Sequence, residues 1–113
     1  MIEIFYHGSP FRIDEPIQRG ACITKERFYA LKYVLRHPSR AGFIYVLEVD
    51  TERDLEIKYD KDGIFDDYLL GRDLAFVERL EVTTELIQKC RDEEKAHVRR
   101  LGGLRFPVEP DAS

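Results

Sequence analysis

Ile2-Glu3-Ile4-Phe5-Tyr6-His7-Gly8-Ser9-Pro10, near the N-terminus, is the segment on which the interpretation of the fold depends. Its β-branched and aromatic residues alternate enough to predict a strand over residues 2–6. Gly8, Ser9 and Pro10 are turn-forming residues, so the strand is expected to end there. Its tip then carries an imidazole, a bare backbone and a hydroxyl, which are groups that can hold a sugar or an amide.

Beyond this segment the pattern predicts further strands and two helices. Strands are expected at residues 21–24, 43–49, 54–59, 66–70 and 75–82, with helices at 25–36 and 85–100 and a turn at 60–63. The strand at 43–49 begins with an apolar run typical of a strand buried on both faces in the interior of a sheet, and 54–59 is expected at an edge. Thr24 is placed to cap the first helix, and Thr83 or Thr84 the second.

Together these elements predict a single α+β domain at residues 1–104, followed by a mobile tail at 105–113. The sequence is 43% hydrophobic and 35% charged, which fits a folded globular domain. Its apolar runs are too short for a membrane span, and the N-terminus lacks the pattern of a signal peptide, so the expected location is the cytoplasm.

Charge and cysteine content narrow the classes of ligand. The net charge of −4 argues against broad binding of nucleic acid, although it leaves a local basic groove possible. Arginines at 91, 99, 100 and 105 are diluted by neighbouring acids, which favours a solvated helix face. Cys22 and Cys90 are expected as unpaired thiols, and without spaced histidines they predict no zinc site.

Three features follow one another in a particular order. A strand ends in His7-Gly8-Ser9, a strand from Gly20 to Thr24 leads into a helix that carries Tyr33, and a late strand opens with Asp67-Tyr68. This order resembles the ADP-ribosyltransferases of the diphtheria-toxin and poly(ADP-ribose) polymerase branch, over roughly residues 4–82. The resemblance implies two small, mainly antiparallel sheets with one or two packed helices, and NAD bound as a substrate between them.

The resemblance also implies roles for individual residues. The histidine of the family bonds the ribose next to nicotinamide, the glycine backbone bonds the carboxamide, the second tyrosine stacks on the ring, and an acid stabilises the oxocarbenium-like sugar as nicotinamide leaves. Either arginine of the loop after the motif would be a bidentate donor to the pyrophosphate. The implied catalytic residues are His7, Tyr33 and Asp67; the implied NAD-binding residues are His7, Gly8, Ser9, Arg12, Arg19, Thr24 and Tyr33; no metal is implied.

Two positions depart from the family pattern. Cys22 stands where the family has its first tyrosine, and losing that stacking ring removes roughly 0.5–1.5 kcal/mol unless Tyr29 replaces it. Asp67 stands where the family has glutamate, one methylene longer, with Asp66 and Glu78 as alternative acids. The other branch of the superfamily uses an arginine on the first strand and a Ser-Thr-Ser segment, and neither occurs here.

The function that follows is transfer of ADP-ribose from NAD to a macromolecular acceptor, preferably a protein, by a small effector or toxin-like protein of bacterial or phage type. One alternative is a catalytically degenerate transferase fold that binds or inhibits another protein. A second is an NAD-dependent RNA 2′-phosphotransferase, which needs basic residues for the phosphate. A third is a small α+β interaction domain without a nucleotide site.

Overall fold

The structure, a computed structural model, describes residues 1–60 and 66–100, and of residues 57–60, 66 and 67 the backbone alone. In chain order the elements are β1 (Ile2–Ser9), β2 (Cys22–Thr24), α1 (Arg27–Leu35), β3 (Phe43–Asp50), β4 (Leu55–Asp60), β5 (Asp66–Leu70), β6 (Glu78–Glu81) and α2 (Thr84–Arg100). The α+β class predicted from the sequence is confirmed. The tail at 105–113, the domain boundary at 104 and most of the turn expected at 60–63 lie outside the described residues.

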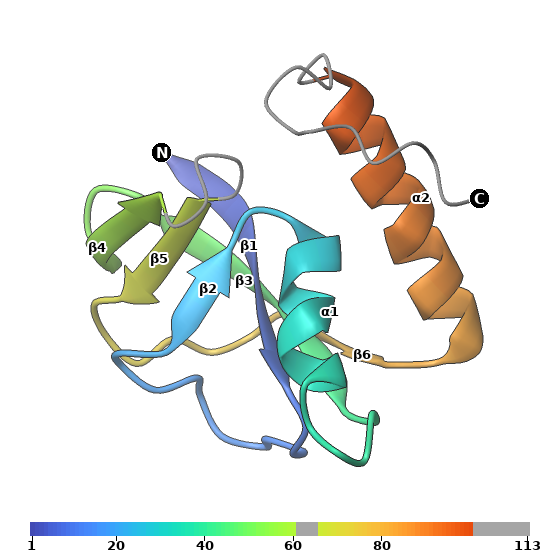
Figure 1. Ribbon diagram of the computed structural model, residues 1–113. Coiled ribbons are helices and arrows are strands. Elements are labelled where there is room, and N and C mark those ends of the chain that lie inside the picture. Colours follow the sequence, from blue (N-terminus) through green and yellow to red (C-terminus); the bar gives the residue numbers. More distant parts are fainter. Residues whose placement is uncertain (61–65, 101–113) are drawn as a thin grey trace.

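The strands form one antiparallel sheet in the order β4-β5-β2-β1-β3-β6 (Figure 1). Its two halves are joined unequally. β1 pairs with β3 along its whole length, from Ile2 opposite Asp50 to Ser9 opposite Phe43. β1 and β2, by contrast, share a single registered pair, Tyr6 with Thr24. The two small sheets expected from the sequence are therefore two halves of one sheet, β4-β5-β2 and β1-β3-β6, joined by a narrow junction.

β1 does not stop at residue 6 as predicted, because pairing with β3 carries it through Ser9. Gly8 is thus inside the strand, where its lack of a side chain serves close packing. A Cβ placed on Gly8 would lie 2.1 Å from the carbonyl oxygen of Ala30 in α1. The helix backbone therefore rests directly on the strand, and the glycine that looked like a strand breaker is required for contact between helix and strand.

The sheet has a core on each face. One face is covered by both helices, through a cluster that includes Phe28, Leu31 and Ile44 with Leu86 and Cys90 of α2. The opposite face is covered by the loop between β1 and β2, and its cluster contains the following buried residues: Phe5, Ile17, Ile23, Tyr45, Leu47, Val49, Tyr68 and Leu70. Because side chains alternate along a strand, neighbouring residues of β1 belong to different cores.

The ends of several elements differ from the prediction. The N-cap of α1 is Glu26 without a side-chain hydrogen bond, and the Thr24 hydroxyl instead accepts from the N–H of Glu26 at 3.3 Å. Thr83 does cap α2, accepting from the N–H of Leu86 at 3.1 Å. β6 is shorter than the predicted strand at 75–82, and before it Leu74 forms an isolated bridge to Ile17. β4 is an edge strand, as predicted.

Candidate functional site

The candidate site lies where β1 and β2 separate after their single pair. Peptide groups of successive residues in an antiparallel strand point alternately to its two neighbours. The N–H of Thr51 donates to the carbonyl of Met1 on the β3 side, at 3.0 Å, so odd residues of β1 direct their peptide groups to β3 and even residues to β2. The peptide of Gly8 therefore points toward β2, beyond the registered pair of Tyr6 and Thr24.

His7 spans the space between the separating strands. Its Nδ1 lies 2.8 Å from the carbonyl oxygen of Cys22 on β2. A carbonyl only accepts, so Nδ1 carries the proton and donates. Burial lowers the pKa of His7 below its ordinary value of 6.5, and the hydrogen bond to Cys22 offsets part of that effect. At neutral pH the ring is therefore uncharged, and Nε2 is the nitrogen left with a lone pair for a ligand hydroxyl.

A cavity of about 360 Å³ adjoins His7. It is lined by His7 and by the loop that leads to β2, with these residues: Ile13, Glu15, Pro16, Ile17, Gln18, Arg19 and Ala21. The volume is at the lower end of the range for small-molecule sites. Of the residues predicted from the sequence, the cavity brings His7 and Arg19 together, whereas Gly8, Ser9, Arg12, Thr24 and Tyr33 are not among the residues that line it.

Arg19 is held at the cavity by two acids. Its backbone N–H donates to Oδ1 of Asp73 at 2.8 Å, and its guanidinium donates to Oε1 of Glu56 at 3.3 Å. Glu15 and Gln18 line the same cavity and were not predicted. They lie in a segment without a periodic pattern, so no local sequence signal marks them as residues of the cavity.

Three other predicted residues have interactions within the chain. The hydroxyl of Ser9 accepts from the N–H of Phe11 at 3.1 Å, and Ser9 is buried. Thr24 is 1% exposed. Arg12 pairs with Asp14 at 3.0 Å and is exposed. These contacts shape the loop and the strand ends, and the assignment of the three residues to NAD binding stays a prediction.

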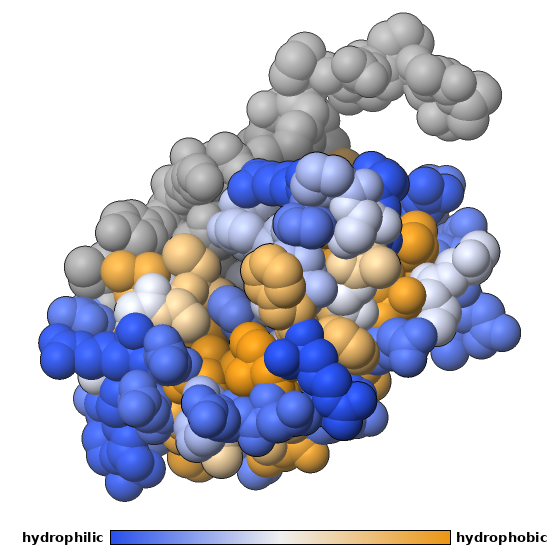
Figure 2. All heavy atoms as spheres, turned by 90° about the horizontal axis from the view of Figure 1, so that it is seen from below, coloured by the Kyte–Doolittle hydropathy of each residue, from blue (hydrophilic) through white to orange (hydrophobic). Residues whose placement is uncertain are grey.

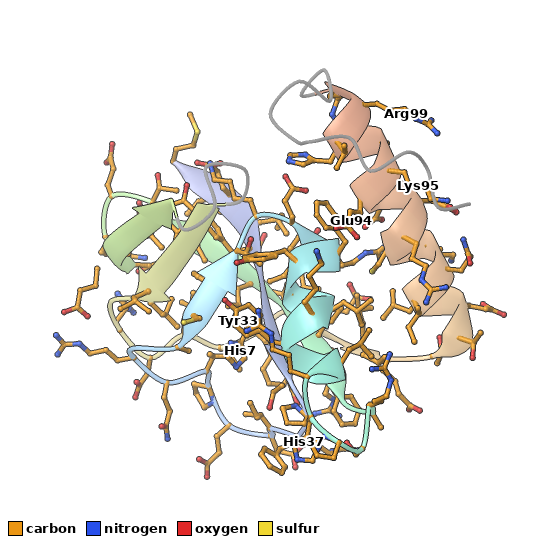
Figure 3. The ribbon with its side chains drawn as sticks, in the orientation of Figure 1. His7, Tyr33, His37, Glu94, Lys95 and Arg99 are labelled. Atoms are coloured by element: carbon orange, nitrogen blue, oxygen red, sulfur yellow. The ribbon has the colours of Figure 1, made fainter. Side chains whose placement is uncertain are left out.

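Tyr33 lies on α1 and His7 on β1, two elements packed against each other (Figure 3). The Tyr33 ring meets the ring of Tyr29 edge-to-face at 5.8 Å, and the guanidinium of Arg36 lies 5.0 Å from its centre. It packs against the core on the helix-covered face. Tyr33 is thus half-buried with one aromatic neighbour already in place.

The register fixes the backbone position of Asp67. Asp67 is opposite Thr24, which is opposite Tyr6, so these residues form one row across β5, β2 and β1. The side chains of Asp66 and Asp67 lie outside the described part. Glu78 is on β6, at the far edge of the other half, and is exposed.

No protein-family model, no curated protein and no solved structure matches this chain. Among the side chains that the structure describes, no group of three or more His, Cys, Asp or Glu residues is arranged to hold a metal ion. Neither helix in the described ranges has the length and apolar character needed to cross a membrane.

Proposed function

We propose that this protein binds NAD at the junction of β1 and β2 and transfers its ADP-ribose to a macromolecular acceptor, preferably a protein. One observation carries the proposal: His7 is fixed by the Cys22 carbonyl at the point where the two halves of the sheet part, next to a cavity. In this arrangement a ribose hydroxyl donates to Nε2 of His7. The peptide of Gly8, directed to the same gap, is suited to the carboxamide of nicotinamide.

The chemistry requires a carboxylate near the breaking bond. As nicotinamide leaves, positive charge develops on the ribose, and a preorganised anion lowers the energy of that state. The resemblance gives this role to Asp67, with Asp66 and Glu78 as alternatives, and gives Tyr33 the role of stacking on nicotinamide. We retain these assignments as part of the proposal. The effector or toxin-like class of bacterial or phage type, which the resemblance implies, stays part of this proposal.

Charge at the cavity weighs against the RNA 2′-phosphotransferase. Arg19 is the single cation among the described residues that line the cavity, and Glu56 already pairs with it. Glu15 adds a negative charge on the same wall. A 2′-phosphate finds little there to neutralise it, whereas the nicotinamide ring of NAD is itself a cation. The binding module or inhibitor remains the second candidate, because Cys22 replaces a tyrosine.

We propose that the reaction takes place in the cytoplasm. The deciding measurement is the melting temperature with and without millimolar NAD, because a ligand bound only by the native state raises it. A rise is expected in the wild type and not in His7→Ala, and nicotinamide release with cell extract then separates an enzyme from a binder. An unchanged melting temperature in the wild type would refute the proposal.

A further inference from the structure

The loop at residues 10–20 forms most of the cavity wall, yet apart from the bridge of Ile17 to Leu74 it belongs to no strand or helix. Backbone hydrogen bonds hold its second half: Ile17 exchanges two with Leu74, at 2.8 and 2.9 Å, and the N–H of Gly20 donates to Leu70 at 2.7 Å. The first half of the loop therefore depends on side chains that hold it to the sheet. Seen from below, the molecule has apolar side chains grouped among charged ones (Figure 2). The exposed Phe11 of this loop packs edge-to-face on the His37 ring at 5.6 Å.

A single row of the sheet supplies two of these holding side chains. His7 on β1 is opposite Tyr45 on β3, and Tyr45 is opposite Arg79 on β6. The three side chains therefore lie on one face of the sheet, the face that the loop covers. The rings of His7 and Tyr45 are 6.3 Å apart between centres. The row thus begins at the proposed ligand-binding residue and ends at the edge strand.

Tyr45 holds the first part of the loop. It is fully buried, and its hydroxyl donates to the carbonyl of Phe11 at 3.1 Å and accepts from the N–H of Ile13 at 2.5 Å. Both polar groups of the loop are thereby satisfied by one side chain. Because the same ring neighbours His7, Tyr45 connects the first part of the loop to the strand that carries His7.

Arg79 holds the next residues. Its Nη1 donates to the carbonyl of Ile13 at 3.1 Å and to Oδ1 of Asp14 at 3.0 Å. The guanidinium lies 5.7 Å from the centre of the Phe43 ring and 5.8 Å from that of Phe76. Two aromatic neighbours and two acceptors leave a half-buried arginine little freedom, so the loop is held at a defined place.

We infer that Tyr45 and Arg79 are positioning residues for the NAD site: they fix residues 11–14, the first half of the loop. Together with the backbone bonds of its second half, this holds Glu15, Gln18 and Arg19 across the cavity from His7. The inference rests on the proposed function for the identity of the ligand. Neither residue lines the cavity, so both act through the loop. Their loss weakens binding of NAD and leaves the reacting groups in place.

The test compares Tyr45→Phe, Arg79→Lys and Arg79→Ala with Arg53→Ala, an exposed arginine of the β3–β4 turn that pairs with Asp54. Trypsin cleavage after Arg12 and Arg19, followed by mass spectrometry, reports the loop without any ligand. Loss of two hydrogen bonds is expected to speed this cleavage about tenfold in Arg79→Ala. Tyr45→Phe loses two hydrogen bonds as well but keeps its ring, whereas Arg79→Ala also loses the contacts with Phe43 and Phe76, so a smaller increase is expected in Tyr45→Phe. Arg79→Lys should keep part of the protection, and Arg53→Ala should match the wild type.

Binding of NAD then tests whether the loop matters for the site. We expect Kd and KM for NAD to rise about tenfold in Arg79→Ala, with kcat within about twofold of the wild type. Unchanged cleavage in Arg79→Ala and Tyr45→Phe overturns the inference, and so does a loosened loop with wild-type affinity for NAD. If the wild type itself binds no NAD, the proposed function fails, and the cleavage rates still decide whether these residues hold the loop.

Discussion

The two sides of β1 differ in how they are joined to the sheet. Toward β3 the strand is paired from Ile2 to Ser9, whereas toward β2 one pair, Tyr6 with Thr24, makes the connection. The paired side carries the row that begins with His7, and the opposite side leaves the peptide of Gly8 directed into the gap. A rigid strand beside an opening is an arrangement that lets a ligand approach the backbone without loss of the fold.

Both sides of β1 contribute to the orientation of His7. Its backbone is held by the β3 side, and its ring is held by the Cys22 carbonyl from the β2 side. The imidazole thus bridges the two halves at the place where main-chain pairing stops. Changes to either side should therefore have different consequences, and their sizes can be ranked.

The largest effect on stability is expected from Gly8→Ala, which changes a residue of β1 on the side of the sheet paired with β3. The new Cβ meets the Ala30 carbonyl at 2.1 Å, and because that carbonyl belongs to the helix backbone and cannot rotate away, α1 must move off β1. We expect a loss of about 3 kcal/mol or more in the free energy of unfolding. Gly20→Ala is the matched control: its φ of +89° costs about 1 kcal/mol, and nothing lies within 4 Å of its Cβ. Urea titration measures both, and equal losses would contradict the packing explanation.

The next effect comes from the other half of the sheet. Asp54 is 1% exposed, and its Oδ2 accepts from the N–H of Asp50 at 2.8 Å, while Oδ1 faces Arg53 and Arg72. Asp54→Ala leaves that N–H unsatisfied, and a loss of about 2 kcal/mol follows. Because this turn joins β3 to β4 and not to the junction, NAD affinity below the melting temperature should stay within about twofold of the wild type. A large loss of affinity would show that the halves are coupled.

How far the sequence predicted the fold is clearest at the strands. The interior strand at 43–49 and the edge strand at 54–59 follow from local apolar patterns, and both are confirmed. The predicted end of β1 was wrong. Gly8 is a glycine because α1 packs closely on it, and not because the strand turns there. Local propensity describes a residue's own backbone and contains nothing about a helix that packs on it later.

The site was predictable only in part, for a similar reason. His7 and Arg19 line the cavity, and both were found through the order of motifs. Tyr45 and Arg79 could not be predicted from the sequence as residues that act on the site, because only the strand register places them in one row with His7. Tyr45 in particular has the pattern of an ordinary core residue, and its hydroxyl acquires a role from a loop distant in sequence.

A smaller effect sharpens the junction itself. Cys22 is exposed on β2, and its thiol is where the resemblance has a tyrosine. Cys22→Tyr should add a stacking surface for nicotinamide worth about 1 kcal/mol, so Kd for NAD falls roughly fivefold. Cys22→Leu is the control, since it adds apolar bulk without an aromatic face. Calorimetry measures the affinities, and equal values for the two variants would argue against stacking at this position.

The two cysteines also provide a chemical comparison of the gap and the core. Burial raises the pKa of Cys90 to about 11, so this thiol stays protonated and unreactive at neutral pH. Cys22 is exposed at the junction. Alkylation at pH 8 followed by mass spectrometry should modify Cys22 and leave Cys90 intact, and saturating NAD should slow the modification of Cys22. Equal rates with and without NAD would show that NAD does not bind at the gap between β1 and β2.

The smallest effect concerns the proton on His7. In the native state burial holds its pKa below 6.5, whereas in the unfolded chain it titrates near that value. Between those two pKa values the unfolded state binds a proton that the native state does not, so the stability from His7 is complete above pH 6.5 and falls as the pH drops toward the native pKa. His7→Asn keeps a donor for the Cys22 carbonyl without titrating, and should flatten this part of the stability curve, with His37→Asn as the control. Suppose instead that both variants keep the wild-type dependence of unfolding free energy on pH between pH 6.5 and 5. His7 is then protonated as easily in the native state as in the unfolded chain, and its ring is not a buried, neutral link between the two halves of the sheet.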